Sequence, residues 1–290
     1  MRLGKLAALA LAGTVFAVPA FAQRVISLGG GVTEMVYALG AGDKLIAADS
    51  TSTFPDAANS VPKLGYVRTL GAEGVLSLTP DIILAGAEAG PPDVLQKLAA
   101  SGIKLVRIPE ALDIDQVPAN IRIVADALGV ADKGKIVSDQ VSQDIGALKE
   151  MLKGAPKTKA LFILSAGRGT PMAAGTHTIA DTIIRMAGGE NVNSAITGYK
   201  PVSAEAVLGF DPAVIVTGSH VADALGGAAG IAKLPELSGT AAAKNGRIAV
   251  LDSLYLLGLG PRTAHAVHDL AIAFGTPLPA LPDRPWLSPN

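Results

Sequence analysis

The sequence predicts an α/β protein made of two Rossmann-like lobes with parallel sheets, joined by a single long α-helix. Short runs rich in Val and Ile alternate with longer amphipathic segments, which is typical of parallel strands connected by crossover helices. The stretch AEGVLSLTPDIILAG at 72–86 aligns without gaps on AEAVLGFDPAVIVTG at 204–218, so one unit is repeated. Between the two copies, residues 131–154 have the spacing of a long amphipathic helix.

The first 22 residues have the composition of a secretory signal peptide. Arg2 and Lys5 make a basic start, an apolar stretch runs from Leu6 to Val18, and Ala20-Phe21-Ala22 fits a cleavage site. The alternative, a retained membrane helix, suits neither the length nor the flanks of this stretch. We therefore expect export, with a mature chain that begins at Gln23.

Composition limits the class of protein. The chain has no cysteine, so neither disulfides nor a lipid-modified cysteine are expected, and an exported fold must be held by its apolar core. Without Arg2 and Lys5, 22 basic residues stand against 25 acidic ones, and this net charge of −3 is wrong for a nucleic-acid-binding protein. No later segment is apolar and long enough to span a bilayer, so the mature protein is not expected to be an integral membrane protein.

The first lobe is predicted over residues 23–130. Gly29-Gly30-Gly31 follows the first strand, and we expect a helix capped by Thr33 with Glu34 in its first turn. The glycine spacing is wrong for a phosphate-binding loop, so a tight strand-to-helix turn is expected instead. A second helix should begin near Pro91. The predicted strands of this lobe are 24–29, 44–49, 81–86 and 104–109.

The connecting helix is predicted over residues 131–154 and should end at Gly154-Ala155-Pro156. A single helix between lobes resists hinge bending, so we expect no large opening and closing. Its apolar positions are Ile136, Val141, Ile145, Leu148 and Leu152.

The second lobe is predicted over residues 155–290, with strands at 159–165, 213–218 and 247–252. The proline-rich end, TPLPALPDRPWLSPN, is expected to be an extended tail with Trp286 packed on a lobe. Ligands of such two-lobed proteins lie in the cleft outside the carboxyl ends of the strands.

The repeat relates four polar residues in pairs. Tyr66 and Tyr199 each follow a glycine and should occupy equivalent loops directed at the cleft between the lobes. Glu73 and Glu205 should begin equivalent helices, on an outer face that suits a two-fold symmetric partner. The alternatives are a tyrosine that caps the core with its ring, and glutamates that only complement the helix dipole.

Two segments carry a resemblance to a known family. GYVRTLGAEGVLSLTPD at 65–81 and PMAAGTHTIADTIIRMAGG at 171–189 resemble the haem-binding periplasmic proteins of bacterial haem ABC importers, which are class III (cluster A) substrate-binding proteins. The resemblance covers essentially the whole mature chain. It implies a periplasmic monomer that captures hemin (haem b) and delivers it to an inner-membrane ABC permease dimer with its ATPase.

The resemblance also implies roles for individual residues. Tyr66 would ligate the ferric haem iron with Arg68 beside it, and Glu73 and Glu205 would meet arginines of the permease. An anionic phenolate is a hard oxygen donor that suits ferric iron, and a neighbouring guanidinium stabilises it. Whether one haem or two are bound stays open.

Four further residues are candidates for haem contacts. His177 is expected either as a sixth iron ligand or as the ligand of a second haem, unless it is only a solvated residue before a helix. Arg168 and Lys200 could pair with haem propionates, and Tyr199 is expected to line the cleft.

Two other functions are kept as alternatives. The same fold could bind cobalamin or a ferric siderophore. A secreted metal-dependent enzyme could use His265 and His268, which share a helix face, but ligands from both lobes are not evident. No Ser–His–acid motif and no cysteine nucleophile occur, so an enzyme is not expected.

Overall fold

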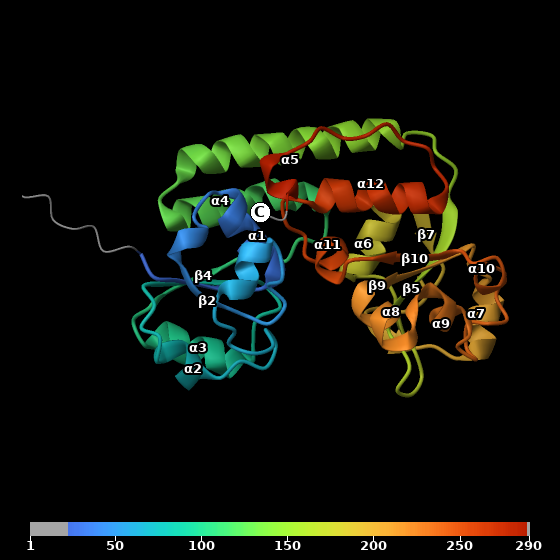
Figure 1. Ribbon diagram of the computed structural model, residues 1–290, viewed down its shortest axis with the longest axis horizontal. Helices are drawn as coiled ribbons and strands as arrows, with labels where there is room; N and C mark the ends of the chain where they lie inside the picture. The colour runs from blue at the N-terminus through green and yellow to red at the C-terminus, as the bar shows by residue number, and fades with distance from the viewer. Residues whose placement is uncertain (1–22, 289–290) are drawn as a thin grey trace, which may run out of the picture.

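The computed structural model describes residues 23–288, which form two α/β lobes side by side (Figure 1). The predicted signal peptide at 1–22 lies outside the described residues. Within residues 23–288 we find no helix with the length and apolar character needed to cross a bilayer.

The first lobe is built on a four-stranded parallel sheet of order β2-β1-β3-β4. The four strands lie where the sequence predicts them: β1 (Val25–Leu28), β2 (Leu45–Ala48), β3 (Ile82–Ala85) and β4 (Lys104–Arg107). Strands β1 and β3 are buried along their whole length, which explains their uninterrupted apolar sequences. The helices are α1 (Gly30–Ala38), α2 (Ala72–Leu76), α3 (Pro92–Ala100) and α4 (Val117–Leu128), with short 3₁₀ turns at Gly42–Lys44, Asp56–Ser60 and Ile114–Gln116.

The second lobe has a mixed sheet, so the prediction of two parallel sheets is wrong in part. Its parallel strands follow the order β7-β5-β9-β10, which repeats the order of the first sheet. Two antiparallel strands, β6 and β8, continue the sheet from the far half of β5. The strands are β5 (Thr158–Ser165), β6 (Met172–Ala174), β7 (Gly189–Asn191), β8 (Tyr199–Pro201), β9 (Val214–Gly218) and β10 (Ile248–Leu251).

The sequence did not predict β6, β7 or β8, because three residues are too few to establish an apolar alternation.

Seven helices cover the second lobe and its junction with the first. They are α6 (Ile179–Met186), α7 (Ala204–Phe210), α8 (Ser219–Leu225), α9 (Gly227–Ala232), α10 (Ala241–Lys244), α11 (Ser253–Leu257) and α12 (Thr263–Phe274).

Each sheet separates two apolar layers. Along β1, Val25 belongs to the layer under α1 and α4, whereas Ile26 and Leu28 belong to the layer with α2 and α3. Along β5, Phe162 and Leu161 point to opposite layers in the same way. The loops at the carboxyl edges of the sheets carry the candidate site.

The long helix α5 (Ala131–Met151) runs along both lobes (Figure 1). Val137, Val141, Ile145 and Leu148 are buried, but Ile136 is 54% exposed, so its predicted place in the apolar stripe is wrong. Gly134, also on the buried side of α5, packs directly on Ala125 of α4, where a Cβ would clash.

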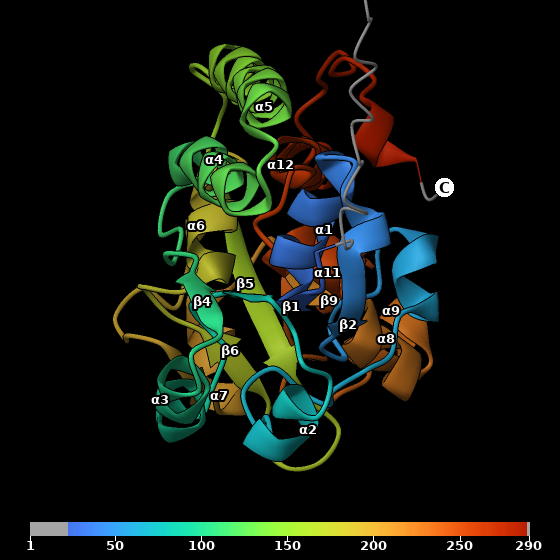
Figure 2. The ribbon, with the colours of Figure 1, turned by 90° about the vertical axis from the view of Figure 1, so that its left-hand side faces the viewer.

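The helix α1 also differs from its prediction. It begins at Gly30 rather than after Thr33, and Glu34 is buried within it instead of lying in an exposed first turn. Glu34 pairs with Arg262 of the second lobe. Helices α1 and α11 lie side by side at this junction (Figures 1 and 2).

Candidate ligand-binding site

A tight turn holds Tyr66 and Arg68 at the surface of the first lobe. Thr69 N–H donates to the carbonyl of Tyr66 at 2.9 Å, which closes the turn. Val67 is buried, with 2% of its surface exposed, and anchors the turn in the core, whereas 48% of Tyr66 is exposed. Gly65 has φ +90°, a backbone conformation that favours glycine, and it directs the chain into the turn.

Backbone hydrogen bonds fix this turn at the carboxyl edge of the sheet. On one side, Ser50 N–H, beyond β2, donates to Gly65 O at 2.8 Å. On the other side, Gly90 N–H, in the loop after β3, donates to Val67 O at 2.9 Å, and Leu70 N–H returns to Gly90 O at 3.0 Å. The turn therefore has little freedom to move relative to the sheet.

The second lobe repeats this arrangement. Gly198 has φ +75° and precedes Tyr199, as Gly65 precedes Tyr66. Gly198 exchanges backbone hydrogen bonds with Gly175 and Thr176, at 2.8 and 2.9 Å. Both tyrosines thus follow a glycine with positive φ, but Tyr66 lies in a turn and Tyr199 begins β8, which has no counterpart in the first lobe.

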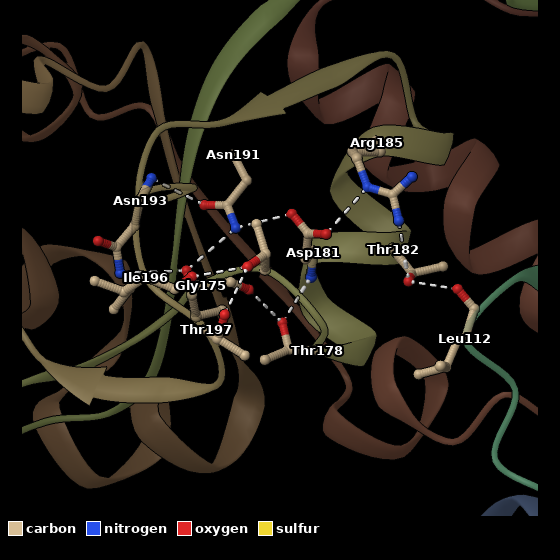
Figure 3. A network of polar contacts seen from close by, with 12 residues as sticks. Leu112, Gly175, Thr178, Asp181, Thr182, Arg185, Asn191, Asn193, Ile196 and Thr197 are labelled. Atoms are coloured by element: carbon tan, nitrogen blue, oxygen red, sulfur yellow. Dashed lines mark hydrogen bonds and ion pairs between the residues drawn. The ribbon is translucent and has the colours of Figure 1, made fainter.

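A buried polar network supports the loops of the second lobe at this edge (Figure 3). Thr178 caps α6 by accepting from Asp181 N–H at 3.1 Å, and Asp181 accepts from Asn191 at 3.0 Å and from Arg185 at 3.0 Å. Thr182 donates to Leu112 O of the first lobe at 3.0 Å, so the network also joins the lobes.

Charged groups of the first lobe act on Tyr199 of the second lobe and on Glu88 of the first. Burial raises the pKa of Tyr199, the Ala180 N–H and the Thr178 hydroxyl oppose this, and Arg68 and Glu110 of the first lobe also act on it. Burial likewise raises the pKa of Glu88, which Asp49 and Glu110 raise further and Arg68 lowers. By its accessible surface, however, the side chain of Glu88 is exposed.

Glu88 and Glu110 were missed in the sequence. Each follows the end of a parallel strand, β3 or β4, and that position is the signal that could have identified them. Together with Arg68 they give the first-lobe edge a mixed charge.

The remaining predicted contacts lie on the second lobe. His177 is exposed, with φ 57°, in the turn before α6, and Lys200 is exposed on β8 next to Tyr199. Arg168 is exposed in the β5–β6 connection. The folding of β6 against β8 therefore brings the segments of His177 and Lys200 to one edge.

Glu73 and Glu205 lie outside this group, in the first turns of α2 and α7. Both are exposed, and no ion pair involves either of them within residues 23–288. Their equivalence follows from the repeat.

His265 and His268 do not form a metal site with other residues in the described part of the chain. Their Nε2 atoms donate to the carbonyls of Pro282 and Pro279, both at 3.0 Å. No group of three or more His, Cys, Asp or Glu that could hold a metal ion occurs within residues 23–288. The metal-dependent enzyme suggested by this pair thus gains no support.

The comparison with protein families matches residues 25–255 to the model described as periplasmic binding protein. A vitamin B12-binding protein of Pectobacterium carotovorum subsp. carotovorum (strain PC1) is 30% identical over 214 residues, which cover 73% of this chain and 76% of that protein.

Two solved structures are similar over most of their length. The periplasmic heme-binding protein RhuT from Roseiflexus sp. RS-1, in apo form, has a TM-score of 0.84 and 36% identity, covering 88% of this chain and 98% of that chain. The periplasmic heme-binding protein BhuT in complex with two hemes has a TM-score of 0.82 and 37% identity, covering 87% and 97%.

Proposed function

The chain belongs to the periplasmic binding protein family, and we propose that it captures haem in the periplasm and delivers it to an inner-membrane ABC permease. The exposed phenol of Tyr66, held in a fixed turn beside Arg68, carries this proposal. Family members of this kind bind and release a substrate for transport, and they are not enzymes.

Tyr66 is the better candidate for the iron ligand of the two repeated tyrosines. The phenol of Tyr66 is half exposed, and within residues 23–288 no protein group hydrogen-bonds its hydroxyl. Tyr199 is more buried, and the Thr178 hydroxyl and the Ala180 N–H already act on its phenol. Tyr199 would line the cleft by its ring.

The chemistry of the site suits ferric haem. Phenolate oxygen is a hard donor that matches Fe³⁺, and the iron itself favours loss of the phenol proton. The guanidinium of Arg68 would stabilise the resulting anion or pair with a propionate. On the second lobe, Lys200 and Arg168 would meet propionates, and His177 would supply a sixth ligand or hold a second haem.

Cobalamin is the second candidate, because the curated relatives include a vitamin B12-binding protein at 30% identity. Haem is favoured because the two haem-binding structures are 36% and 37% identical over a larger share of this chain. In this proposal the Tyr-x-Arg turn would provide the donor for the haem iron.

Absorption titrations test the proposal. The apo protein titrated with hemin should develop the spectrum of a ferric tyrosinate complex, and cyanocobalamin should not compete. Tyr66→Phe should remove that spectrum, whereas Tyr37→Phe, outside the candidate site, should keep it. An unchanged spectrum in Tyr66→Phe would remove the ligand assignment, and competition by cyanocobalamin would favour the second candidate.

A further inference from the structure

We infer that residues 276–287, which we call the inter-lobe strap, fix the spacing of the two lobes and thereby preform the cleft between them. The consequence for ligand release rests on the proposed function, but the mechanical role does not. The strap follows α12 and returns from the second lobe to the first beside α5 (Figure 1).

Residues in and next to the strap pack in the apolar cores of both lobes. Phe274, at the end of α12, is buried in the core of the second lobe, and Leu278 packs against the same cluster. Leu281 and Trp286 are buried in the first-lobe cluster, with α1, α4 and α5. Within thirteen residues the chain is thus embedded in both lobes.

Two histidines hold the middle of the strap. His268 Nε2 donates to Pro279 O and His265 Nε2 donates to Pro282 O, both at 3.0 Å. The carbonyls can only accept, so Nε2 is the donor in both bonds, and Nδ1 of His268 also lies 3.1 Å from a carboxylate oxygen of Asp269. The strap contains prolines at 277, 279, 282 and 285, which reduce the entropy lost when it is ordered.

An ion pair attaches the C-terminal part of the strap to α5. Arg284 donates two hydrogen bonds to the Asp144 carboxylate on α5, at 3.0 and 2.6 Å. The side chain of Asp144 is only 1% exposed, so the pair is shielded from water. Two parallel bonds in a dry site define the relative position of the partners more strictly than a surface pair does.

Trp286 lies beside the ion pair that joins the two lobes, Glu34–Arg262. Its indole N–H donates to Pro261 O at 3.2 Å. Beside it, Arg262 donates to the Glu34 carboxylate of α1 at 3.0 and 2.6 Å, and the guanidinium lies 3.5 Å from the Phe54 ring centroid. The side chains of Arg262 and Glu34 are only 10% and 3% exposed, so the pair is shielded from water.

These fastenings have a common effect on the lobes. Moving the lobes apart would withdraw apolar side chains from one core and separate the buried Glu34–Arg262 pair, which leaves charges without partners. A site held at its bound spacing loses less freedom when the ligand enters. The strap residues therefore position the two faces of the cleft without touching the ligand.

The spacing of the lobes can be measured directly, because the chain has no cysteine of its own. Spin labels at Lys97→Cys on α3 and Lys244→Cys on α10, both exposed, report one distance between the lobes by pulsed electron resonance. Arg284→Gln and Trp286→Ala should broaden the distance distribution. His265→Ala is the milder variant, since it removes one fastening and no buried charge, and it should broaden the distribution less.

Arg122→Gln is the matched control. Arg122 pairs with Asp139 of α5 at 2.8 Å, but this pair lies within the first lobe and is exposed, so the distribution should stay narrow. Circular dichroism identifies the variants that fold. If all folded strap variants give the wild-type distribution, the inference is overturned.

Haem release provides a readout of positioning. Dissociation of hemin, followed by transfer to an excess of apomyoglobin, should be about tenfold faster in Arg284→Gln and unchanged in Arg122→Gln. An equal rate in the two variants would contradict the positioning role. Failure of the wild type to bind hemin would instead contradict the proposed function, and the distance measurement would still decide the role of the strap.

Discussion

Gly31 of the first lobe packs directly on the backbone of Gly258 of the second. A Cβ built at Gly31 would overlap the carbonyl oxygen of Gly258, and the nearest atoms are all backbone. This contact lies next to the Glu34–Arg262 pair, so the third glycine of the opening triplet serves the junction of the lobes rather than the turn after β1.

Gly31→Ala should therefore destabilise the protein by about 1–3 kcal/mol, because the backbone of Gly258 must move to admit the methyl group. Urea unfolding followed by circular dichroism measures the change. Gly146→Ala is the control: Gly146 is in α5 with no atom within 4 Å of an added Cβ, and the change should stabilise by about 0.5–1 kcal/mol. Equal stability of the two variants would contradict the close contact.

Gly65→Ala should weaken hemin binding about tenfold, which equals about 1.4 kcal/mol. The left-handed conformation of Gly65 is strained for alanine, and relief of that strain rotates the turn that carries Tyr66. Gly40, with φ +71°, is exposed and remote from the site, so Gly40→Ala should lose similar stability and retain affinity. A titration in which both variants bind like the wild type would refute this link.

Glu88 should make stability depend on pH. Its folded-state pKa is raised, chiefly by burial, so its favourable contribution is complete below the unfolded value of 4.5 and is lost as pH rises through the folded value. Glu88→Gln, which stays neutral, should gain stability relative to wild type as pH rises from 4 to 8. Thermal unfolding at several pH values measures the difference.

Asp139 should make stability change with pH in the opposite direction to Glu88, so it serves as the comparison. The side-chain hydrogen bond from Lys135, followed by the charge of Lys135 and contacts with Arg122, lowers the pKa of Asp139 below 3.8. Asp139→Asn should therefore lose stability relative to wild type as pH rises from 2 to 5. If both variants respond to pH in the same direction, the origin assigned to the Glu88 shift is wrong.

Reversing the charge of Glu73 and Glu205 together should abolish delivery of haem to the permease and leave hemin affinity unchanged. Both glutamates are exposed on α2 and α7, away from Tyr66. Uptake in vesicles that contain the permease and its ATPase measures delivery. Glu190→Lys, exposed on β7, is the control and should support normal uptake. Undiminished uptake by the double variant would remove the docking assignment.

The sequence predicted those parts of the fold whose signals are local. The apolar runs of β1, β3 and β9 identify buried parallel strands, and the repeat relates Tyr66 to Tyr199 before any coordinates are known. The strands depend on residues close together in the chain and the repeat on a direct match between two stretches, so the sequence alone is sufficient to find them.

The junction of the lobes was not predictable in the same way. Glu34 and Arg262 are 228 positions apart, and Glu34 alone matches the pattern of a first-turn dipole residue. The proline-rich end was expected to be extended with Trp286 packed on a lobe, but nothing in its composition indicated that it returns to the first lobe. His265 and His268 resembled a metal pair because the carbonyls they bind have no sequence signature.

The strand β5 has different neighbours along one edge: β7 pairs with its first residues, and the β6–β8 extension joins near its end. The extension carries Tyr199 and Lys200, yet the four parallel strands beneath it are complete without it. The extension can therefore change in length or composition without disturbing the parallel strands beneath it.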